Sequence, residues 1–237
     1  MVTNGDFMGT YINKDKVLVA VDCIIFGFDP QREVLQLLLI KRDFKPKKGR
    51  WSLMGGFMKK HEDLREAAVR VLTELTGLDN IYLEQLKTFG KIDRDPVERT
   101  VSVAYSALIN TTEHDSGLIN QYSARWFDIS EVPDLIFDHD FMVKTAIKRL
   151  QYRASVQPIG FELLPEKFTM RQLQKLYEEI FNQKLDKRNF IKKINSLKVL
   201  EKLKEKDMTS SRKGSFLYRF NHQKYQEKLK AGFVFKV

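Results

Sequence analysis

The chain has 237 residues, of which 43% are hydrophobic and 30% charged, and its formal net charge at pH 7 is +10. This composition is typical of a soluble globular protein with one large or two small domains, and it excludes collagen-like repeats and wholesale disorder. The longest apolar run, Val17–Phe28, is too short to cross a bilayer, and the single cysteine, Cys23, cannot form an intramolecular disulfide. The N-terminus has no basic lead followed by an apolar core, so we expect a cytoplasmic protein without membrane association.

The excess of positive charge is confined to the C-terminal part of the chain. Residues 1–150 carry 21 lysines and arginines against 22 acidic residues, whereas residues 151–237 carry 20 against 9. Such an asymmetry points to a segment that binds a polyanion, although a merely solvated lysine-rich surface would have the same composition. It also favours two domains, which we place at residues 1–157 and 158–237.

Alternating apolar segments in the first half predict several strands and few helices. Val17–Arg42 contains two apolar runs separated by a turn, which is the pattern of a β-hairpin. A helix is predicted over Asp63–Thr76, and Gly77 follows it in the usual C′ position. The other strands and helix expected in this half are Trp51–Phe57, Tyr82–Phe89, Arg99–Ile109, Arg125–Asp128 and Phe141–Tyr152. The fold class is therefore α+β.

The second half changes to a helix–turn–helix pattern followed by a hairpin. Thr169 caps a predicted helix over residues 170–181 whose apolar residues recur at helical spacing, and Asp186 caps a second helix that runs to about Leu197. Two strands and a basic turn follow, at Val199–Lys204, Phe216–Phe220 and Ser210–Ser215. This is the order of elements in a winged helix–turn–helix domain, and the stretch from Asn221 onward has no predicted structure.

The second helix of this domain carries the residue types that read DNA in the major groove. Arginine can pair with guanine and asparagine with adenine near the N-terminus of such a helix, and lysines one turn later suit phosphates. The tip of the hairpin would reach the flanking backbone or the minor groove. The predicted DNA contacts are Thr169, Arg171, Lys187, Arg188, Asn189, Lys192, Lys193, Arg212 and Lys213. A winged helix that binds another protein and has a solvated basic face is the alternative.

A motif of the Nudix hydrolases lies in residues 56–78. That family's pattern is glycine, five residues, glutamate, seven residues, and then Arg-Glu-aliphatic-x-Glu-Glu-x-Gly-aliphatic. The positions that match are Gly56, Glu62, Arg70, Leu72, Glu74, Gly77 and Leu78. The segment resembles the Nudix box, and the resemblance, over roughly residues 17–150, implies that family's α/β/α sandwich.

The departures from the motif predict a domain that binds its ligand without cutting it. In active members the glutamate after the arginine and the last two glutamates hold a divalent metal, and here these positions are Val71, Glu74 and Leu75. Valine and leucine offer no oxygen ligand, and without a metal there is no Lewis acid and no acidified water. We therefore expect no metal, no cofactor, and absent or feeble hydrolysis. The alternative is a metal-dependent ADP-ribose or nucleoside-diphosphate-sugar pyrophosphatase in which Glu62 or Glu66 joins Glu74, with a basic accessory domain.

A degenerate Nudix domain followed by a winged helix resembles the Nudix-related transcriptional regulators. These include repressors of NAD metabolism that respond to ADP-ribose and arabinose-responsive regulators, and segments such as Phe89–Pro96 and Leu185–Phe190 look most like the arabinose-responsive branch. The resemblance implies a homodimer that binds a double-stranded DNA operator and responds to a sugar or sugar-nucleotide effector. A protein-interaction adaptor with neither effector nor operator is a third interpretation.

The effector contacts are expected on segments that would surround the family's substrate cleft. The candidates are Arg42, Trp51, Phe57, Asp93 and Arg94. Trp51 and Phe57 could equally be core residues, and Arg94 could be a salt-bridged loop arginine. Asp22, inside an apolar strand, is either paired at a strand end or faces a pocket. His139 has no second metal ligand at the spacing of a zinc site, so we expect His139 to have a structural or surface role.

Overall fold

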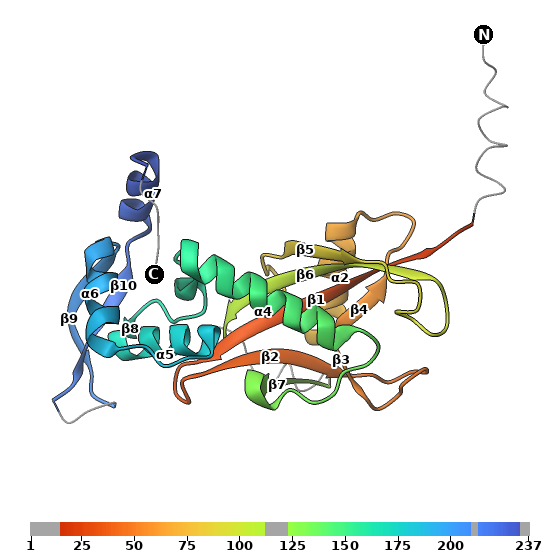
Figure 1. Ribbon diagram of the computed structural model, residues 1–237, viewed down its shortest axis with the longest axis horizontal. Coiled ribbons are helices and arrows are strands. Elements are labelled where there is room, and N and C mark those ends of the chain that lie inside the picture. The colour runs from red at the N-terminus through yellow and green to blue at the C-terminus, as the bar shows by residue number, and fades with distance from the viewer. Residues whose placement is uncertain (1–14, 112–122, 210–212, 233–237) are drawn as a thin grey trace, which may run out of the picture.

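The computed structural model describes residues 15–111, 123–209 and 213–232, which form a mixed β-sheet between two helices and a smaller unit with its own sheet (Figure 1). The larger sheet has the strand order β3-β2-β1-β6-β5, with β4 added to β1 and β7 to β2. Strands β1 and β6 run parallel, and the other pairs are antiparallel. The strands are β1 (Leu18–Asp29), β2 (Val34–Lys41), β3 (Trp51–Ser52), β4 (Met54–Phe57), β5 (Glu84–Phe89), β6 (Thr100–Asn110) and β7 (Ala124–Asp128).

The larger sheet is covered by a helix on each face. Because side chains alternate along a strand, the apolar residues of β1 belong to two separate hydrophobic clusters. One cluster contains side chains of α4 (His139–Val156) and the other contains side chains of α2 (Leu64–Thr76). The residues of β1 in these clusters are Ile24, Phe26 and Phe28 on the α4 side and Val21, Cys23 and Ile25 on the α2 side. The α/β/α sandwich and the α+β fold class are confirmed.

The C-terminal unit is a winged helix, as the sequence predicts. Its elements are β8 (Phe168–Thr169), α5 (Met170–Phe181), α6 (Lys187–Leu197), β9 (Leu200–Asp207) and β10 (Ser215–Phe220), and the strands pair in the order β8-β10-β9. Two 3-10 turns, η2 (Ile129–Glu131) and η3 (Ile159–Glu162), flank α4. The stretch without predicted structure forms α7 (His222–Lys230), whose N-terminus is capped by the side chain of Asn221. No described helix is long and apolar enough to cross a membrane.

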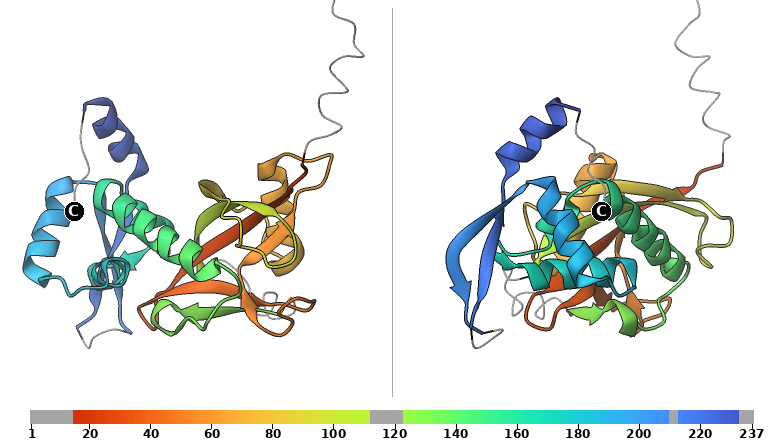
Figure 2. Two further views of the ribbon diagram at one scale, coloured as in Figure 1. Left: turned by 45° about the vertical axis from the view of Figure 1, so that its right-hand side comes forward. Right: turned by 60° about the vertical axis from the view of Figure 1, so that its left-hand side comes forward.

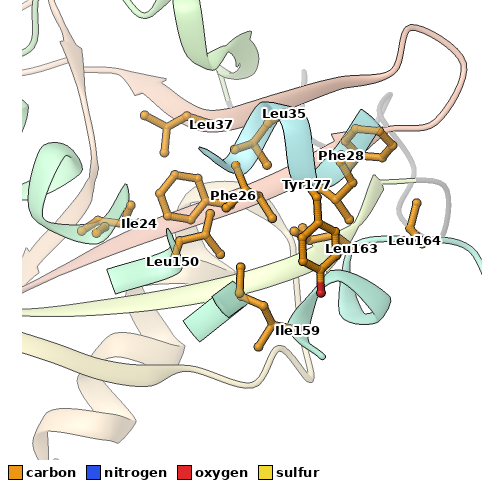
Figure 3. Packing of buried hydrophobic residues seen from close by; sticks show 14 of the residues in the cluster. Ile24, Phe26, Phe28, Leu35, Leu37, Leu150, Ile159, Leu163, Leu164 and Tyr177 are labelled. Carbon is orange, nitrogen blue, oxygen red and sulfur yellow. The ribbon is translucent and has the colours of Figure 1, made fainter. Parts of the chain in front are cut away.

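The two units share one hydrophobic cluster. Tyr177 of α5 packs among residues of the β1–β2 hairpin, including Phe28 and Leu35 (Figure 3). The same junction has polar contacts, since the Gln172 side chain donates to the Pro30 carbonyl oxygen at 3.2 Å. The hydrophobic core therefore continues across the junction between the two units. Figure 2 shows the winged helix against one end of the larger sheet. The domain boundary at residues 157–158 stays a prediction.

Candidate effector pocket and nucleic-acid interface

The residues of the Nudix box hold the loop before α2 against the helix. Arg70 donates to Glu62 from Nε at 2.7 Å and from Nη2 at 2.6 Å, and to Glu74 from Nη1 at 3.1 Å. The Arg70 guanidinium lowers the pKa of Glu62 to about 2. The helix ends at Gly77 with a φ of 72°, a conformation that favours glycine. Glu62 and Glu74, the two glutamates of the Nudix box that remain, are therefore both hydrogen-bonded to Arg70.

The side chains that replace the family's metal ligands lie in an apolar environment. Val71 is 2% exposed and packs so closely on β4 that a Cβ added to Gly56 would lie 2.8 Å from its Cγ2 atom. Leu75 is partly buried against the same cluster. Glu66 is used in the capping box of α2, where its side chain accepts from the Asp63 backbone. The residues present do not fit a hydrolytic metal centre, and no group of three or more potential ligands occurs in the described part of the chain.

Two cavities beside the N-terminus of α4 share Arg94 and Phe137 in their walls. The larger, of about 730 Å³, is lined by basic and acidic residues that include Lys47, Arg50, Lys91, Asp93 and Asp138. The smaller, of about 100 Å³, combines polar groups with aromatic rings: Asp22, Arg42, Phe44, Ser52, Phe57 and His139. Hydrogen-bonding groups beside aromatic rings form an environment that suits a small polar ligand.

A buried ionic cluster lines the smaller cavity. Asp22 accepts a hydrogen bond from the Ser102 hydroxyl and lies 3.7 Å from Nη2 of Arg94. Arg94 in turn donates to both carboxylate oxygens of Asp138, at 2.8 and 3.1 Å. Gly55 is required here, because a Cβ at this position would lie 2.3 Å from Oδ1 of Asp22. Asp22 therefore faces the pocket and is paired there as well.

His139 completes this cluster from the first turn of α4. Its Nδ1 atom accepts from the Leu53 backbone N–H at 3.2 Å, so in the neutral ring the proton lies on Nε2, 3.6 Å from Oδ1 of Asp22. Burial lowers the pKa of His139, although the neighbouring carboxylates oppose this. The ring is therefore neutral at pH 7 and offers an N–H donor beside the cavity.

Four of the five predicted effector contacts line these cavities, and one does not. Arg42 and Phe57 line the smaller cavity, Asp93 the larger, and Arg94 both. Trp51 lines neither, because its ring packs edge-on against Phe127 with 4.7 Å between centroids, and we therefore assign it to the core.

The polar residues that sequence reasoning did not select come from distant segments. They include Asp138 and His139 at the start of α4 and Lys47, Arg50 and Lys91 around the larger cavity, and the aromatic residues Phe44 and Phe137 lie beside them. The one signal was Asp22, a charged residue in the middle of an apolar strand. The other side chains follow no periodicity or motif, so only the fold brings them to the pocket.

The N-terminal turn of α6 presents the predicted DNA-reading residues to solvent. Asp186 caps the helix by accepting from the Asn189 backbone N–H at 2.8 Å. Phe190, Ile194 and Leu197 anchor the opposite face in the core. Lys187, Arg188, Asn189, Lys192 and Lys193 are exposed and form no ion pair with any described residue. This is an arrangement that can contact a polyanion without first breaking internal bonds.

The remaining predicted DNA contacts are placed differently. Thr169 is 2% exposed, and its hydroxyl caps α5 by accepting from the Gln172 backbone N–H, so we no longer count it as a DNA contact. Arg171 is tied to Glu33 of the β1–β2 turn, at 2.9 and 3.1 Å, which gives it a role at the domain junction. Lys213 is exposed on the wing, and Arg212 lies outside the described residues.

Comparisons with known proteins agree with this architecture. Residues 16–147 match the family model of the NUDIX domain, and residues 160–220 match the model of the NrtR DNA-binding winged helix domain. An ADPR responsive transcriptional repressor from Acinetobacter baylyi is 34% identical over 225 residues, which cover 92% of this chain and 89% of the relative. The fold and these matches define a Nudix domain joined to a DNA-binding winged helix. The chain belongs to the Nudix-related transcriptional regulators of the NrtR type.

Two solved structures from Shewanella oneidensis are also similar. NrtR complexed with a 27mer DNA has a TM-score of 0.73 and 27% identity, and the match covers 85% of this chain and 93% of that one. The NUDIX domain of NrtR complexed with ADP ribose has a TM-score of 0.54 and 29% identity, with coverage of 63% and 99%. The more specific likeness to the arabinose-responsive branch stays unconfirmed.

Proposed function

We propose that this protein is a cytoplasmic transcriptional regulator that binds a double-stranded operator as a homodimer, under the control of a sugar-containing effector in the Nudix pocket. The observation that carries the proposal is the exposed N-terminal turn of α6, where Arg188 and Asn189 are available to base edges while Asp186 fixes the start of the helix. Two copies of α6 in a dimer would read half-sites about one helical turn apart.

We infer that the effector is a sugar nucleotide, with ADP-ribose as the first candidate. Lys47, Arg50 and Lys91 around the larger cavity have the charge that a diphosphate requires. The smaller cavity supplies Asp22 and the His139 N–H as partners for sugar hydroxyls. The named Acinetobacter relative is ADPR responsive, and the Shewanella NUDIX domain was solved with ADP ribose, which supports the same choice.

A free pentose is the second candidate, favoured by the smaller cavity. The aromatic rings of Phe44, Phe57 and Phe137 and the polar groups between them could hold a monosaccharide without any phosphate contact. The two candidates differ in what they require of the basic side chains. Lys47→Gln with Arg50→Gln should abolish ADP-ribose binding and leave the binding of a pentose unchanged.

DNA binding is tested by selecting duplexes from a random library with the full-length protein and measuring affinity by fluorescence anisotropy. Arg188→Ala and Asn189→Ala are each expected to cost about 1–3 kcal/mol on the selected duplex and to relax base preference. Lys148→Gln, on α4, is the matched control for loss of one charge and should bind normally. Failure of the wild-type protein to select or retain any duplex at low salt would refute the proposal and favour the adaptor.

Effector control is tested by calorimetric titration with ADP-ribose, pentoses and hexoses, followed by anisotropy with the bound compound present. A true effector must change DNA affinity, because it acts only through its different affinities for the two states of the regulator. Release of AMP from ADP-ribose with Mg²⁺ or Mn²⁺ is the outcome that would favour a hydrolase. We expect none, since Val71 and Leu75 present no oxygen to a metal.

A further inference from the structure

The turn between α5 and α6 is held by two side chains that reach back from α5. Glu178 accepts the Leu185 backbone N–H at 3.1 Å, and the side-chain amide of Gln174 donates to the Leu185 carbonyl oxygen, also at 3.1 Å. The same amide donates to Glu178 at 3.0 Å, which closes a ring of hydrogen bonds around one residue of the turn. We call Gln174 and Glu178 the turn clamp.

The turn clamp contains a buried charge. Glu178 is 6% exposed, and a buried carboxylate is unfavourable unless cations and hydrogen-bond donors surround it. Lys175 and Lys184 lie 2.9 and 3.7 Å from its Oε2 atom, while Oε1 accepts from Gln174 and from Leu185. Water can satisfy the backbone groups of an ordinary surface turn. Here the chain uses a carboxylate, an amide and two lysines to fix the backbone of one residue.

The residue that is fixed directly precedes the DNA-reading end of α6. Asp186 caps the helix, and its first turn, Lys187–Asn189, has no buried side chain. The fully buried anchors of α6 begin only at Phe190, and Leu185 itself is partly buried. Figures 1 and 2 show α6 crossing α5 at a steep angle. The position of the first turn of α6 relative to α5 therefore depends on the turn clamp.

We propose that the turn clamp positions the first turn of α6 for base recognition, so that Gln174 and Glu178 determine operator specificity through Arg188 and Asn189. This inference rests on the proposed DNA-binding function. Hydrogen bonds to base edges require correct alignment of the side chains, whereas attraction to phosphates depends mainly on charge and tolerates a displaced helix. Loosening the turn therefore reduces discrimination between DNA sequences and leaves nonspecific affinity nearly unchanged.

The test measures affinity for the selected duplex and for a scrambled duplex of the same length, and takes the ratio of the two as the specificity. Gln174→Met removes the donor to Leu185 and keeps a side chain of similar length. It should lower the specificity about tenfold, while affinity for the scrambled duplex changes less than about twofold. Gln85→Met, at an exposed position of β5, is the matched control and should keep the wild-type specificity.

Substitutions of Glu178 separate positioning from stability. Glu178→Gln keeps an oxygen that can accept the Leu185 N–H but loses the charge that pairs with the lysines, so it should retain most of the specificity although the fold is less stable. Glu178→Met has no acceptor and should lower the specificity as Gln174→Met does. Ile109→Val, in the hydrophobic cluster on the α2 side, is the control for a loss of stability alone and should keep the specificity.

Three results would contradict these expectations in different ways. If Gln174→Met and Glu178→Met keep the wild-type specificity while Arg188→Ala lowers it, the turn clamp does not position the helix and this inference is wrong. It is also wrong if Ile109→Val lowers the specificity as much as Gln174→Met, because the effect is then one of stability. If the wild type binds both duplexes alike or binds neither, it is the proposed function that fails.

Discussion

The shared hydrophobic cluster predicts that the Nudix domain and the winged helix unfold as one unit. Ile194 of α6 is fully buried and lies far along the chain from Phe26 and Leu37, yet all three belong to the same cluster. Replacing Ile194 with alanine removes buried carbon atoms and leaves a cavity, which costs about 3 kcal/mol. For a chain of this size the loss corresponds to a decrease of roughly 6–12 °C in Tm.

The positions of the tryptophans allow a direct test by urea unfolding. Trp51 and Trp126 lie in the larger sheet and the winged helix has none, so tryptophan fluorescence follows the Nudix domain alone, whereas far-UV circular dichroism follows both domains. Ile194→Ala should move both transitions by the same amount, and Lys192→Ala, at an exposed position of the same helix, should move neither. A fluorescence midpoint that stays at the wild-type value while dichroism shows an earlier step would refute the coupling.

Three further predictions follow from the site and the domain junction. Gly55→Ala places a methyl group against Asp22, so it should abolish effector binding in calorimetry and destabilise the fold by about 1–3 kcal/mol, and unchanged affinity would contradict the geometry. Burial opposes ionisation of Glu178, but a lysine and backbone and amide donors lower its pKa to about 2, below its ordinary value of 4.5. The stabilisation that the Glu178 carboxylate provides is therefore complete above about pH 5 and disappears as the pH falls towards 2. Glu178→Gln should therefore have a lower free energy of unfolding than the wild type at pH 7, and this difference, measured by urea unfolding, should decrease in acid. Arg171→Gln breaks an exposed ion pair with Glu33 and should change DNA affinity less than about twofold, whereas a loss as large as that of Arg188→Ala would restore Arg171 as a DNA contact.

Local patterns were sufficient to predict most of the elements. The sequence predicts that the helix at the Nudix box ends at Gly77, and the structure confirms this, while Asp63, the first residue of the predicted range, is the N-terminal cap. The hairpin of β1 and β2 and the order of elements in the winged helix follow from the same kind of short-range information. Such features depend on neighbours three or four residues away, which the sequence displays directly.

The details that could not be predicted depend on partners far away in the chain. The sequence leaves Trp51 and Phe57 equivalent, and only the position of Phe127 makes one of them core. Arg171 has a residue type suited to DNA, but it is paired with Glu33 in the turn of another domain, 138 residues away in the chain. The pocket cluster around Asp22 is of the same kind, because its members come from strands β1 and β6, the loop between β5 and β6, and the start of α4.

Strand β1 connects the proposed effector pocket to the winged helix. Asp22 near its beginning lines the pocket, and Phe28 near its end packs in the cluster that includes Tyr177 of α5. Because close-packed interiors transmit small shifts rather than absorbing them, a ligand that moves β1 also moves the hairpin on which α5 rests. The winged helix then moves together with the Nudix domain of the same chain, as one rigid body. We therefore expect an effector to change operator affinity through the spacing between the two α6 helices of the proposed dimer, and not through a hinge inside one chain.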